Sequence, residues 1–309
     1  MKRRDKNTRT RHVNHLSNKR LNDWMWAYLM IFPTTAGLFV FYIYPFFQSF
    51  FYSFTDLGSF GQYAWVGLQN YVRLVGDTEV WQALLNTVIY TVLSVPVGIC
   101  LSILIAALLN SKIKGLGTYR TLYFLPAVTM PVAIAMVWRW LYNMDYGLIN
   151  SILERFSIEG RAWVSDPKFA LYSVIIVAIW STVGYNMVII LAGMQQCSRT
   201  YYEAAEIDGA GTITKFFKIT IPLITPTLFF VTVMSLIRAF QVFDTIYLMI
   251  ERNSTALERT QSLVYLYYRN AFILHEKGYA SANVMVLFVI ILIITYIQFK
   301  SQNKWVHYE

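Results

Sequence analysis

Six long stretches without charge constrain this chain more than any other feature of its sequence. They contain no Asp, Glu, Lys or Arg and are 18 to 32 residues long. A helix needs about 20 mainly apolar residues to cross the roughly 30 Å hydrocarbon core of a membrane. We therefore predict an all-α integral membrane protein with six transmembrane helices, at residues 24–46, 82–109, 120–142, 169–193, 222–248 and 279–299.

The composition excludes a soluble globular chain. Of the 309 residues, 56% are hydrophobic and 14% are charged, against roughly 45–50% and 25% in soluble domains. Eight Lys or Arg and two acids fall within residues 1–23. This division predicts a basic tail, residues 1–23, followed by one membrane domain, residues 24–309.

The distribution of lysine and arginine predicts the orientation of the spans, because short cytoplasmic loops carry an excess of these residues. With the N-terminus inside, the inner segments hold 16 of the 26. Both termini are therefore predicted to lie in the cytoplasm, in a multi-pass protein of the cell membrane. The net charge of +9 then needs no nucleic-acid partner, and no base-stacking or groove-reading motif accompanies the basic tail.

The sequence contains no catalytic or metal-binding motif. It has no G-x-x-x-x-G-K-[ST], H-E-x-x-H, C-x-x-C or G-x-S-x-G pattern, and its four histidines are scattered over the two ends and one outer loop. An enzyme within the membrane would need a nucleophile or a metal pair held in the spans. We expect no catalytic residue, no metal site and no cofactor bound by this chain itself.

The inner segment between the fourth and fifth predicted spans is unusual for a membrane-protein loop. Residues 202–222 read YEAAEIDGAGTITKFFKITIP. The Ala-rich start favours a helix, Gly209 and Gly211 end it, and Thr212 or Thr214 is expected to cap a second helix. Exposed Ala and Phe beside acidic residues suggest a docking surface for another protein. The alternative, a connector resting on lipid headgroups, is disfavoured by the acidic residues.

This segment resembles the EAA loop of the membrane subunits of binding-protein-dependent ABC importers. That loop reads E-A-A, three residues, Gly, nine residues and I-x-L-P, and this chain matches every spacing, with Ile221 in place of Leu. The extended form E-A-A-x-x-D-G-A is similar to the carbohydrate-uptake branch, which includes maltose-type and glycerol-phosphate-type permeases. Further segments that resemble this branch are residues 66–71, 138–150, 239–249 and 262–272.

The resemblance implies a type-I transmembrane domain that shares a translocation path with a second permease subunit. It also implies two ATPase subunits, which bind ATP and Mg at the cytoplasmic face, and an extracytoplasmic solute-binding protein. In this family the loop is a coupling helix seated in a cleft of the ATPase. The residues that would couple to the ATPase are Glu203 through an ionic contact, Ala204 and Ala205 through close approach, Asp208, and Gly209 through the turn.

The resemblance also indicates where a solute would bind. In maltose-type relatives, residues of the spans that flank this loop contact sugar. Counted from Glu203, Tyr185 and Ser235 occupy such positions, and an aromatic ring and a hydroxyl both suit sugar recognition. Other contact positions fall on residues where this chain departs from the relatives: Ala178, Arg238, Ala239 and Val242.

Arg238 is the most informative departure. It lies sixteen residues after Pro222, within the fifth predicted span, and ionisable residues at such depth usually line a cavity or pathway. Asp244 is about 9 Å further along a helix and on another face, so a pair between them is poor. Because arginine binds carboxylates through a two-pronged fork, we hypothesise an acidic, uronate-containing oligosaccharide as substrate. The alternative is a pair between Arg238 and a carboxylate or backbone group of the partner permease.

Three amides are further candidates for the solute path, although each equally suits a hydrogen bond between packed helices. They are Asn186, Gln195 and Gln241.

Together these features predict the membrane permease subunit of an ATP-driven importer for a sugar or oligosaccharide. The first alternative is a permease of the same design for a non-sugar solute, such as a polyol phosphate or a peptide. An ion-coupled secondary carrier is more remote, because it predicts inverted repeats and acidic relays within the membrane. Asp244 is the only acid within a predicted span.

Overall fold

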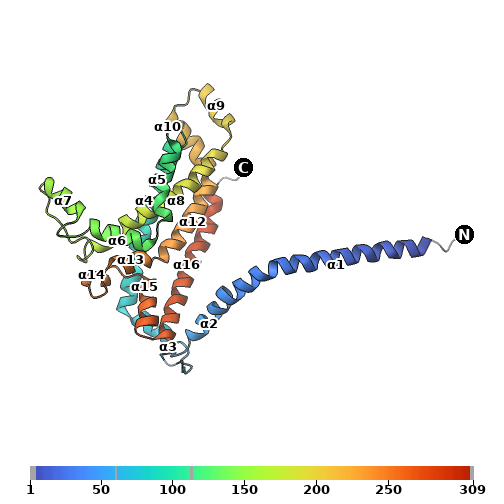
Figure 1. The fold of residues 1–309 in the computed structure, drawn as a ribbon, viewed down its shortest axis with the longest axis horizontal. Helices are drawn as coiled ribbons and strands as arrows, with labels where there is room; N and C mark the ends of the chain where they lie inside the picture. Colours follow the sequence, from blue (N-terminus) through green and yellow to red (C-terminus); the bar gives the residue numbers. More distant parts are fainter. Residues whose placement is uncertain (1–4, 60, 112–113, 307–309) are drawn as a thin grey trace. The chain divides into compact units, whose positions relative to one another are not determined.

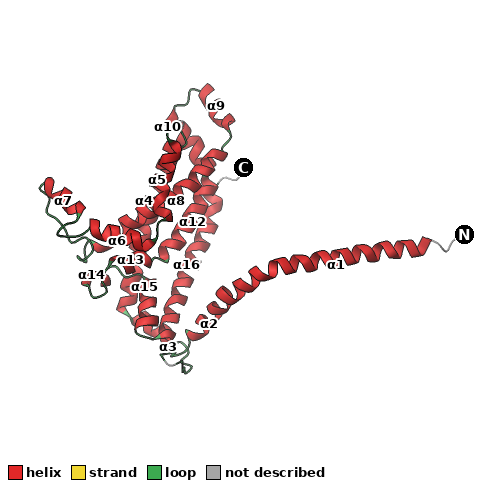
Figure 2. Ribbon diagram, viewed as in Figure 1, coloured by secondary structure: helices red, strands yellow, loops and turns green. Residues whose placement is uncertain are grey.

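The computed structural model describes residues 5–59, 61–111 and 114–306, with side chains from residue 22 onward. Over these residues the chain consists of helices and connecting loops, with an isolated bridge between Thr55 and Trp65 and no strand (Figure 2). The predicted all-α class is confirmed. The chain divides into two compact units, residues 1–52 and residues 53–309.

The first unit is a nearly continuous helix. α1 (Asp5–Leu38) passes through the π-helical segment η1 (Phe39–Ile43) into α2 (Tyr44–Tyr52). The tail predicted for residues 1–23 is therefore helical from Asp5, and its first four residues lie outside the described part of the chain. Residues 22–52 are long and apolar enough to cross a membrane, and they include the first predicted span.

The second unit holds the remaining candidate spans. Three are single helices: α4 (Thr78–Leu109), α8 (Ala170–Gln196) and α16 (Lys277–Trp305). Two are bent pairs: α5 (Leu116–Val128) with α6 (Pro131–Leu141), and residues 212–223 with α12 (Thr225–Phe240). Together with residues 22–52, the described residues offer four continuous spans, or six if each bent pair counts as one.

Helices α4 and α8 form the centre of the second unit. They pack along each other, α5 packs on α8, and α12 packs on both α4 and α8. The Ser102 hydroxyl of α4 donates to the Val183 carbonyl of α8 at 3.1 Å. Helices in a membrane associate through close van der Waals packing and such hydrogen bonds, because lipid offers no hydrophobic driving force. The central pair is therefore held by both kinds of contact.

The third predicted span, residues 120–142, is not one continuous helix. α5 and α6 meet at an angle of 98°. Pro131 has no N–H and keeps the preceding residue extended, and Met130 accordingly has a ψ of 134°. The 13 residues of α5 reach about 20 Å, short of the roughly 30 Å that a membrane core requires.

The fifth predicted span, residues 222–248, is also interrupted. α12 ends at Phe240, and α13 (Asp244–Met249) begins after three intervening residues. No proline or glycine stands at this break. Instead the Val242 carbonyl accepts a hydrogen bond of 2.6 Å from the buried Ser262 hydroxyl, which satisfies a backbone group that a continuous helix would have bonded internally.

Short elements join the long helices of the second unit. Their bounds are α3 (Gln69–Gly76), α7 (Leu148–Arg155), α9 (Arg199–Ile207), α10 (Thr212–Lys215), η2 (Phe216–Thr220), α11 (Ile221–Leu223), α14 (Thr255–Glu258), α15 (Leu263–Tyr268) and η3 (Arg269–Ile273). Figure 1 shows α9 and α10 at the end of this unit opposite to α3 and α15. The second unit therefore has two separate ends, connected by its long helices.

Gly184 marks a close approach between α8 and α5. A methyl group at this position would lie 1.9 Å from the carbonyl oxygen of Tyr123, a backbone atom. We expect Gly184→Ala to lower the free energy of unfolding by at least the roughly 1–3 kcal/mol typical of overpacked sites. The measurement is the Tm of the purified protein in detergent. Gly117→Ala is the control, since no atom lies within 4 Å of a methyl group there, and equal Tm values for the two variants would contradict the close packing.

Candidate functional site

The predicted docking loop folds into a helix, a turn and a second helix. α9 begins after Ser198, whose hydroxyl accepts a hydrogen bond of 3.4 Å from the Thr200 N–H. It ends at Ile207, and the Gly209 N–H turns back onto the Glu206 carbonyl. Gly209 has a φ of 76°, in the left-handed region that favours glycine. The turn predicted at Gly209 therefore has a conformational basis.

The second helix is capped differently from the prediction. α10 begins at Thr212, so Thr212 and Thr214 both lie inside it. The N-cap is Gly211, with φ −70°, ψ 165° and no side-chain hydrogen bond. Glycine is accepted at this position because a cap residue needs extended backbone, which glycine adopts readily. The expectation that a threonine caps this helix is wrong.

The loop presents apolar side chains beside carboxylates. Ile207 is 88% exposed and Ile213 is 75% exposed, while a salt bridge of 2.7 Å between Glu206 and Lys215 ties α9 to α10. Glu203 joins none of the salt bridges in the described part of the chain. Of the predicted coupling residues, Ala205 is half-buried and the others are exposed: Glu203, Ala204, Asp208 and Gly209. This surface has the composition of a protein contact.

A hydrogen bond connects α9 to the helical segment that leads into α12. The hydroxyls of Tyr202 and Thr220 lie 3.0 Å apart. Burial raises the pKa of Tyr202 above its ordinary value of 10, so this hydroxyl is neutral at physiological pH. Thr220 belongs to η2, which directly precedes α11 and α12. The loop is thus fastened to the start of α12 as well as to the end of α8.

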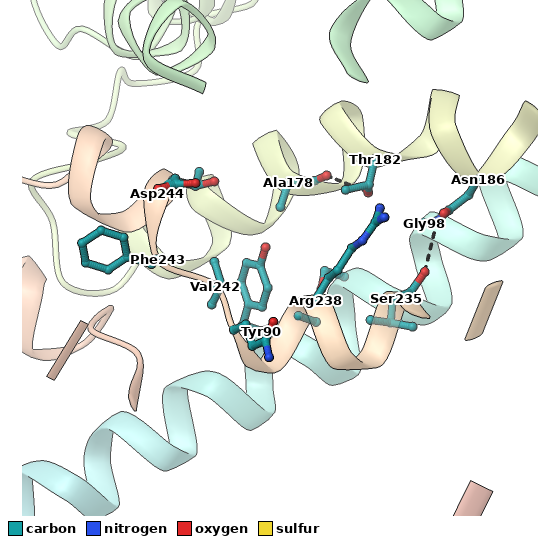
Figure 3. A pocket seen from close by; sticks show the side chains of 15 residues that line it. Tyr90, Gly98, Ala178, Thr182, Asn186, Ser235, Arg238, Val242, Phe243 and Asp244 are labelled. Atoms are coloured by element: carbon teal, nitrogen blue, oxygen red, sulfur yellow. Dashed lines mark hydrogen bonds between the residues drawn. The ribbon is translucent and has the colours of Figure 1, made fainter. Parts of the chain in front are cut away.

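A cavity of about 210 Å³ lies between α4, α8 and α12 (Figure 3). Its wall continues beyond the end of α12 through residues 241–245. Neighbouring residues of a helix point about 100° apart, so five consecutive residues line one cavity only because the chain leaves the helix here. The other lining residues are Tyr90, Ser94, Val95 and Gly98 of α4, Ala178, Thr182 and Asn186 of α8, and Ser235, Arg238 and Ala239 of α12.

The residues predicted for the solute path lie together. Five of them line the cavity: Asn186, Ser235, Arg238, Gln241 and Asp244. Tyr185 lies beside it, because the Cζ atom of Arg238 is 4.6 Å from the centroid of the Tyr185 ring. The other positions counted from Glu203 also line the cavity: Ala178, Ala239 and Val242. Their role in binding a solute stays a prediction.

The amide candidates differ in their surroundings. Asn186 is 7% exposed, and its Nδ2 donates to the Ser235 hydroxyl at 3.3 Å, at one end of the cavity in Figure 3. This is the interhelical bond that was the alternative role for Asn186. Gln241 is exposed at the cavity wall, whereas Gln195 is exposed near the end of α8 and is not part of that wall.

Arg238 has no carboxylate partner in the described part of the chain. The expected absence of a pair with Asp244 holds, but its geometric premise is wrong, because α12 ends at Phe240 and the two residues do not share a helix. Figure 3 shows the guanidinium extending from α12 toward Thr182. Stacking on Tyr185 occupies a face of the guanidinium and leaves its in-plane N–H groups available for an anion.

Sequence reasoning missed the residues that α4 contributes to the cavity, and Thr182 of α8. Tyr90, Ser94 and Gly98 are spaced by four, so they share one face of α4, and all three line the cavity. Thr182 also lines it, although its hydroxyl donates to the Ala178 carbonyl at 2.8 Å. The spacing in α4 was the available signal, hidden within a long uncharged run.

The chain matches known transport proteins over most of its length. Residues 75–306 match a family described as binding-protein-dependent transport system inner membrane component. Over 286 residues it is 37% identical to YesP of Bacillus subtilis (strain 168), a probable ABC transporter permease protein, covering 92% of each chain. Over 289 residues it is 34% identical to LacF of Rhizobium radiobacter, a lactose transport system permease protein, covering 92% of this chain and 95% of that one.

The fold matches a solved structure as well. A chain in the crystal structure of a bacterial ABC transporter involved in the import of the acidic polysaccharide alginate superposes with a TM-score of 0.84 at 22% identity. The match covers 94% of this chain and 99% of that one. The two chains therefore share a fold.

The bond between Asn186 and Ser235 predicts a measurable contribution to stability. Ser235→Ala removes the hydroxyl that a nearly buried amide binds. Interhelical hydrogen bonds in membranes contribute about 0.6 and up to about 1.7 kcal/mol, and we expect a loss of unfolding free energy in this range, measured by denaturant titration in detergent. Ser181→Ala is the matched control, because the Ser181 hydroxyl bonds the Val177 carbonyl of its own helix. An equal loss in both variants would argue against a special role for the interhelical bond.

Proposed function

This chain belongs to the family of binding-protein-dependent transport system inner membrane components, and we propose that it is the permease subunit of an ATP-driven importer for a sugar or oligosaccharide. The family and its apolar helices make it a multi-pass membrane protein. Proteins of this family work with a solute-binding protein, which here would deliver the sugar from outside the cell.

The observation that carries the proposal is the convergence of the predicted solute-path residues on one cavity. Tyr185, Ser235 and Arg238 were reached by counting from Glu203 to positions that contact sugar in maltose-type permeases. Asn186, Gln241 and Asp244 were added for their polar side chains. All six come from two helices and the segment after α12. The cavity offers hydroxyls, amides and an arginine beside aromatic rings, which suits a polyhydroxylated solute. A relative that transports lactose, and a similar fold in an importer of a polysaccharide, support a carbohydrate.

Coupling to ATP would pass through the loop between α8 and α12. In this proposal α9, α10 and both termini face the cytoplasm, each bent helix pair forms one of six spans, and a second permease completes the path. Two ATPase subunits would bind ATP and Mg, and one of them would hold this loop in its cleft. α8 leads into this loop, α12 follows it, and both line the cavity. Closure of the ATPase would therefore move these two helices as rigid bodies and change which side of the membrane the cavity opens to.

An acidic sugar is the substrate that Arg238 favours. The guanidinium lies at the cavity wall without a carboxylate in the described part of the chain. The fork of its N–H groups matches the carboxylate of a uronate. A phosphate would meet the same fork, so a polyol phosphate remains the second candidate and is included as a probe below.

Glu203→Lys tests the coupling loop. We expect the reversed charge to reduce solute-stimulated ATP hydrolysis of the reconstituted importer at least about tenfold, because an ionic contact becomes a repulsion. Glu154→Lys, the same change on α7, is the control and should leave hydrolysis unchanged. Normal stimulation in the Glu203→Lys importer would contradict coupling through this residue.

Arg238→Gln tests the substrate class. The importer is reconstituted with its companion permease, ATPase and binding protein, and ATP hydrolysis is measured with uronate oligosaccharides, neutral oligosaccharides and glycerol phosphate. We expect uronates to stimulate the parent, and Arg238→Gln to weaken that response about tenfold while neutral sugars are unaffected. Equal stimulation of variant and parent by acidic and neutral oligosaccharides would refute the acidic-sugar proposal. Stimulation by glycerol phosphate alone would favour the second candidate.

A further inference from the structure

Four aromatic rings form a row that leads away from the cavity. Phe243, which lines the cavity, stacks on Tyr247 with ring centroids 5.1 Å apart. Tyr247 meets Tyr268 edge to face at 5.3 Å, and Tyr268 stacks on Phe272 at 5.6 Å. Phe243 also lies 5.1 Å from Tyr268. We call these four residues the aromatic row.

The aromatic row is not a buried core. Phe243, Tyr247 and Tyr268 are half-buried, and Phe272 is 60% exposed. Tyr265, which lies behind them, is 2% exposed and fills the structural role that aromatic side chains usually take. The row therefore connects the cavity to the surface of the segment between α12 and α16, which the proposed topology puts outside the cell.

Arg252 packs on a ring of this row, as Arg238 packs on Tyr185. The Cζ atom of Arg252 is 5.0 Å from the centroid of the Tyr247 ring, and its guanidinium donates a hydrogen bond to the Tyr247 hydroxyl. The neighbouring carboxylate of Glu251 is bound by Arg139 instead, at 3.4 Å. Arg252 joins no salt bridge among the residues that the structure describes.

A row of rings beside an arginine that has no carboxylate partner in the described residues matches the chemistry of one ligand class. The C–H faces of pyranose rings pack on aromatic rings, tyrosine hydroxyls exchange hydrogen bonds with sugar hydroxyls, and arginine binds carboxylates. An apolar partner would leave Arg252 without an anion. A neutral sugar would use the rings alone.

We propose that the aromatic row and Arg252 form an outer subsite, which binds a uronate residue of an oligosaccharide on its way to the cavity. This inference rests on the proposed function and extends it with a second binding position. A chain of several sugar units would then have one carboxylate near Arg252, beside Tyr247, and another near Arg238 in the cavity.

The test measures binding of saccharide probes to the membrane complex without its binding protein, so that the measured affinity is that of the permease site itself. The probes are a radiolabelled uronate tetrasaccharide and the same tetrasaccharide with its carboxylates reduced to hydroxymethyl groups, in equilibrium dialysis against the complex in nanodiscs. We expect Arg252→Gln to weaken binding of the uronate probe about tenfold and to leave the reduced probe unchanged. Tyr247→Ala should weaken both probes about fivefold, and Tyr247→Phe, which keeps the ring, should retain the reduced probe.

Arg161→Gln is the matched control. Arg161 also packs on an aromatic ring, Phe169, at 4.5 Å, and joins no salt bridge in the described residues, but Phe169 does not belong to the row. Binding by this variant should equal that of the parent, and an equal loss in Arg161→Gln and Arg252→Gln would reduce the effect to general surface charge and overturn the proposal.

A second readout separates this inference from the function on which it rests. ATP hydrolysis of the same complexes is measured with the binding protein and the uronate tetrasaccharide. If hydrolysis responds to the sugar while Arg252→Gln and Tyr247→Ala bind both probes as the parent does, the outer subsite is refuted and the importer stands. If the parent responds to no saccharide, the proposed function fails and the subsite fails with it.

Discussion

A polar group within the hydrocarbon core of a membrane has no water to bind, so its partner must come from the protein. In the second unit of this chain such partners join neighbouring helices. The Ser102 hydroxyl reaches the Val183 carbonyl, and the Asn186 amide reaches Ser235. Arg238, the charged group among them, packs on the face of Tyr185 but has no carboxylate partner in the described residues. A site that leaves its strongest donor without an anion is prepared for an anion from elsewhere, which in the proposed importer would come from the solute or from a second permease subunit.

The docking loop and two of the three long helices that line the cavity form one hairpin. α8 leads into α9, the loop returns through η2 and α11, and α12 follows. Both long helices line the cavity, and the bonds from Tyr202 to Thr220 and from Glu206 to Lys215 tie the loop together. A force applied at the loop therefore reaches two of the three helices around the cavity without passing through other elements. Coupling in this proposal depends on the stiffness of two helices and their connection.

The sequence predicted those features that depend on local pattern. Long uncharged runs indicated the helices, and the spacing around Glu203 indicated a family that the match over residues 75–306 confirms. Pro131 is a local signal for the bend between α5 and α6, although one continuous span was predicted there. The break after Phe240 could not be predicted from local sequence, because the bond that supports it comes from Ser262, twenty residues after Val242. Counting from the loop found Arg238 and Ser235, whereas Tyr90 and Ser94 needed the packing of α4 against α8.

The stretch that follows α12 has a bearing on how such a protein diversifies. In a helix, residues that face a cavity are interspersed with residues that pack against neighbouring helices. A substitution that changes solute specificity there therefore also tends to change stability. Residues 241–245 line the cavity consecutively, and the hydrogen bond from Ser262 that supports them engages the backbone of Val242 rather than a side chain. Gln241, Asp244 and Thr245 can therefore be exchanged with little disturbance of the helices. In the proposed importer, exchanges at these few neighbouring positions would change the solute and leave the loop between α8 and α12 as it is.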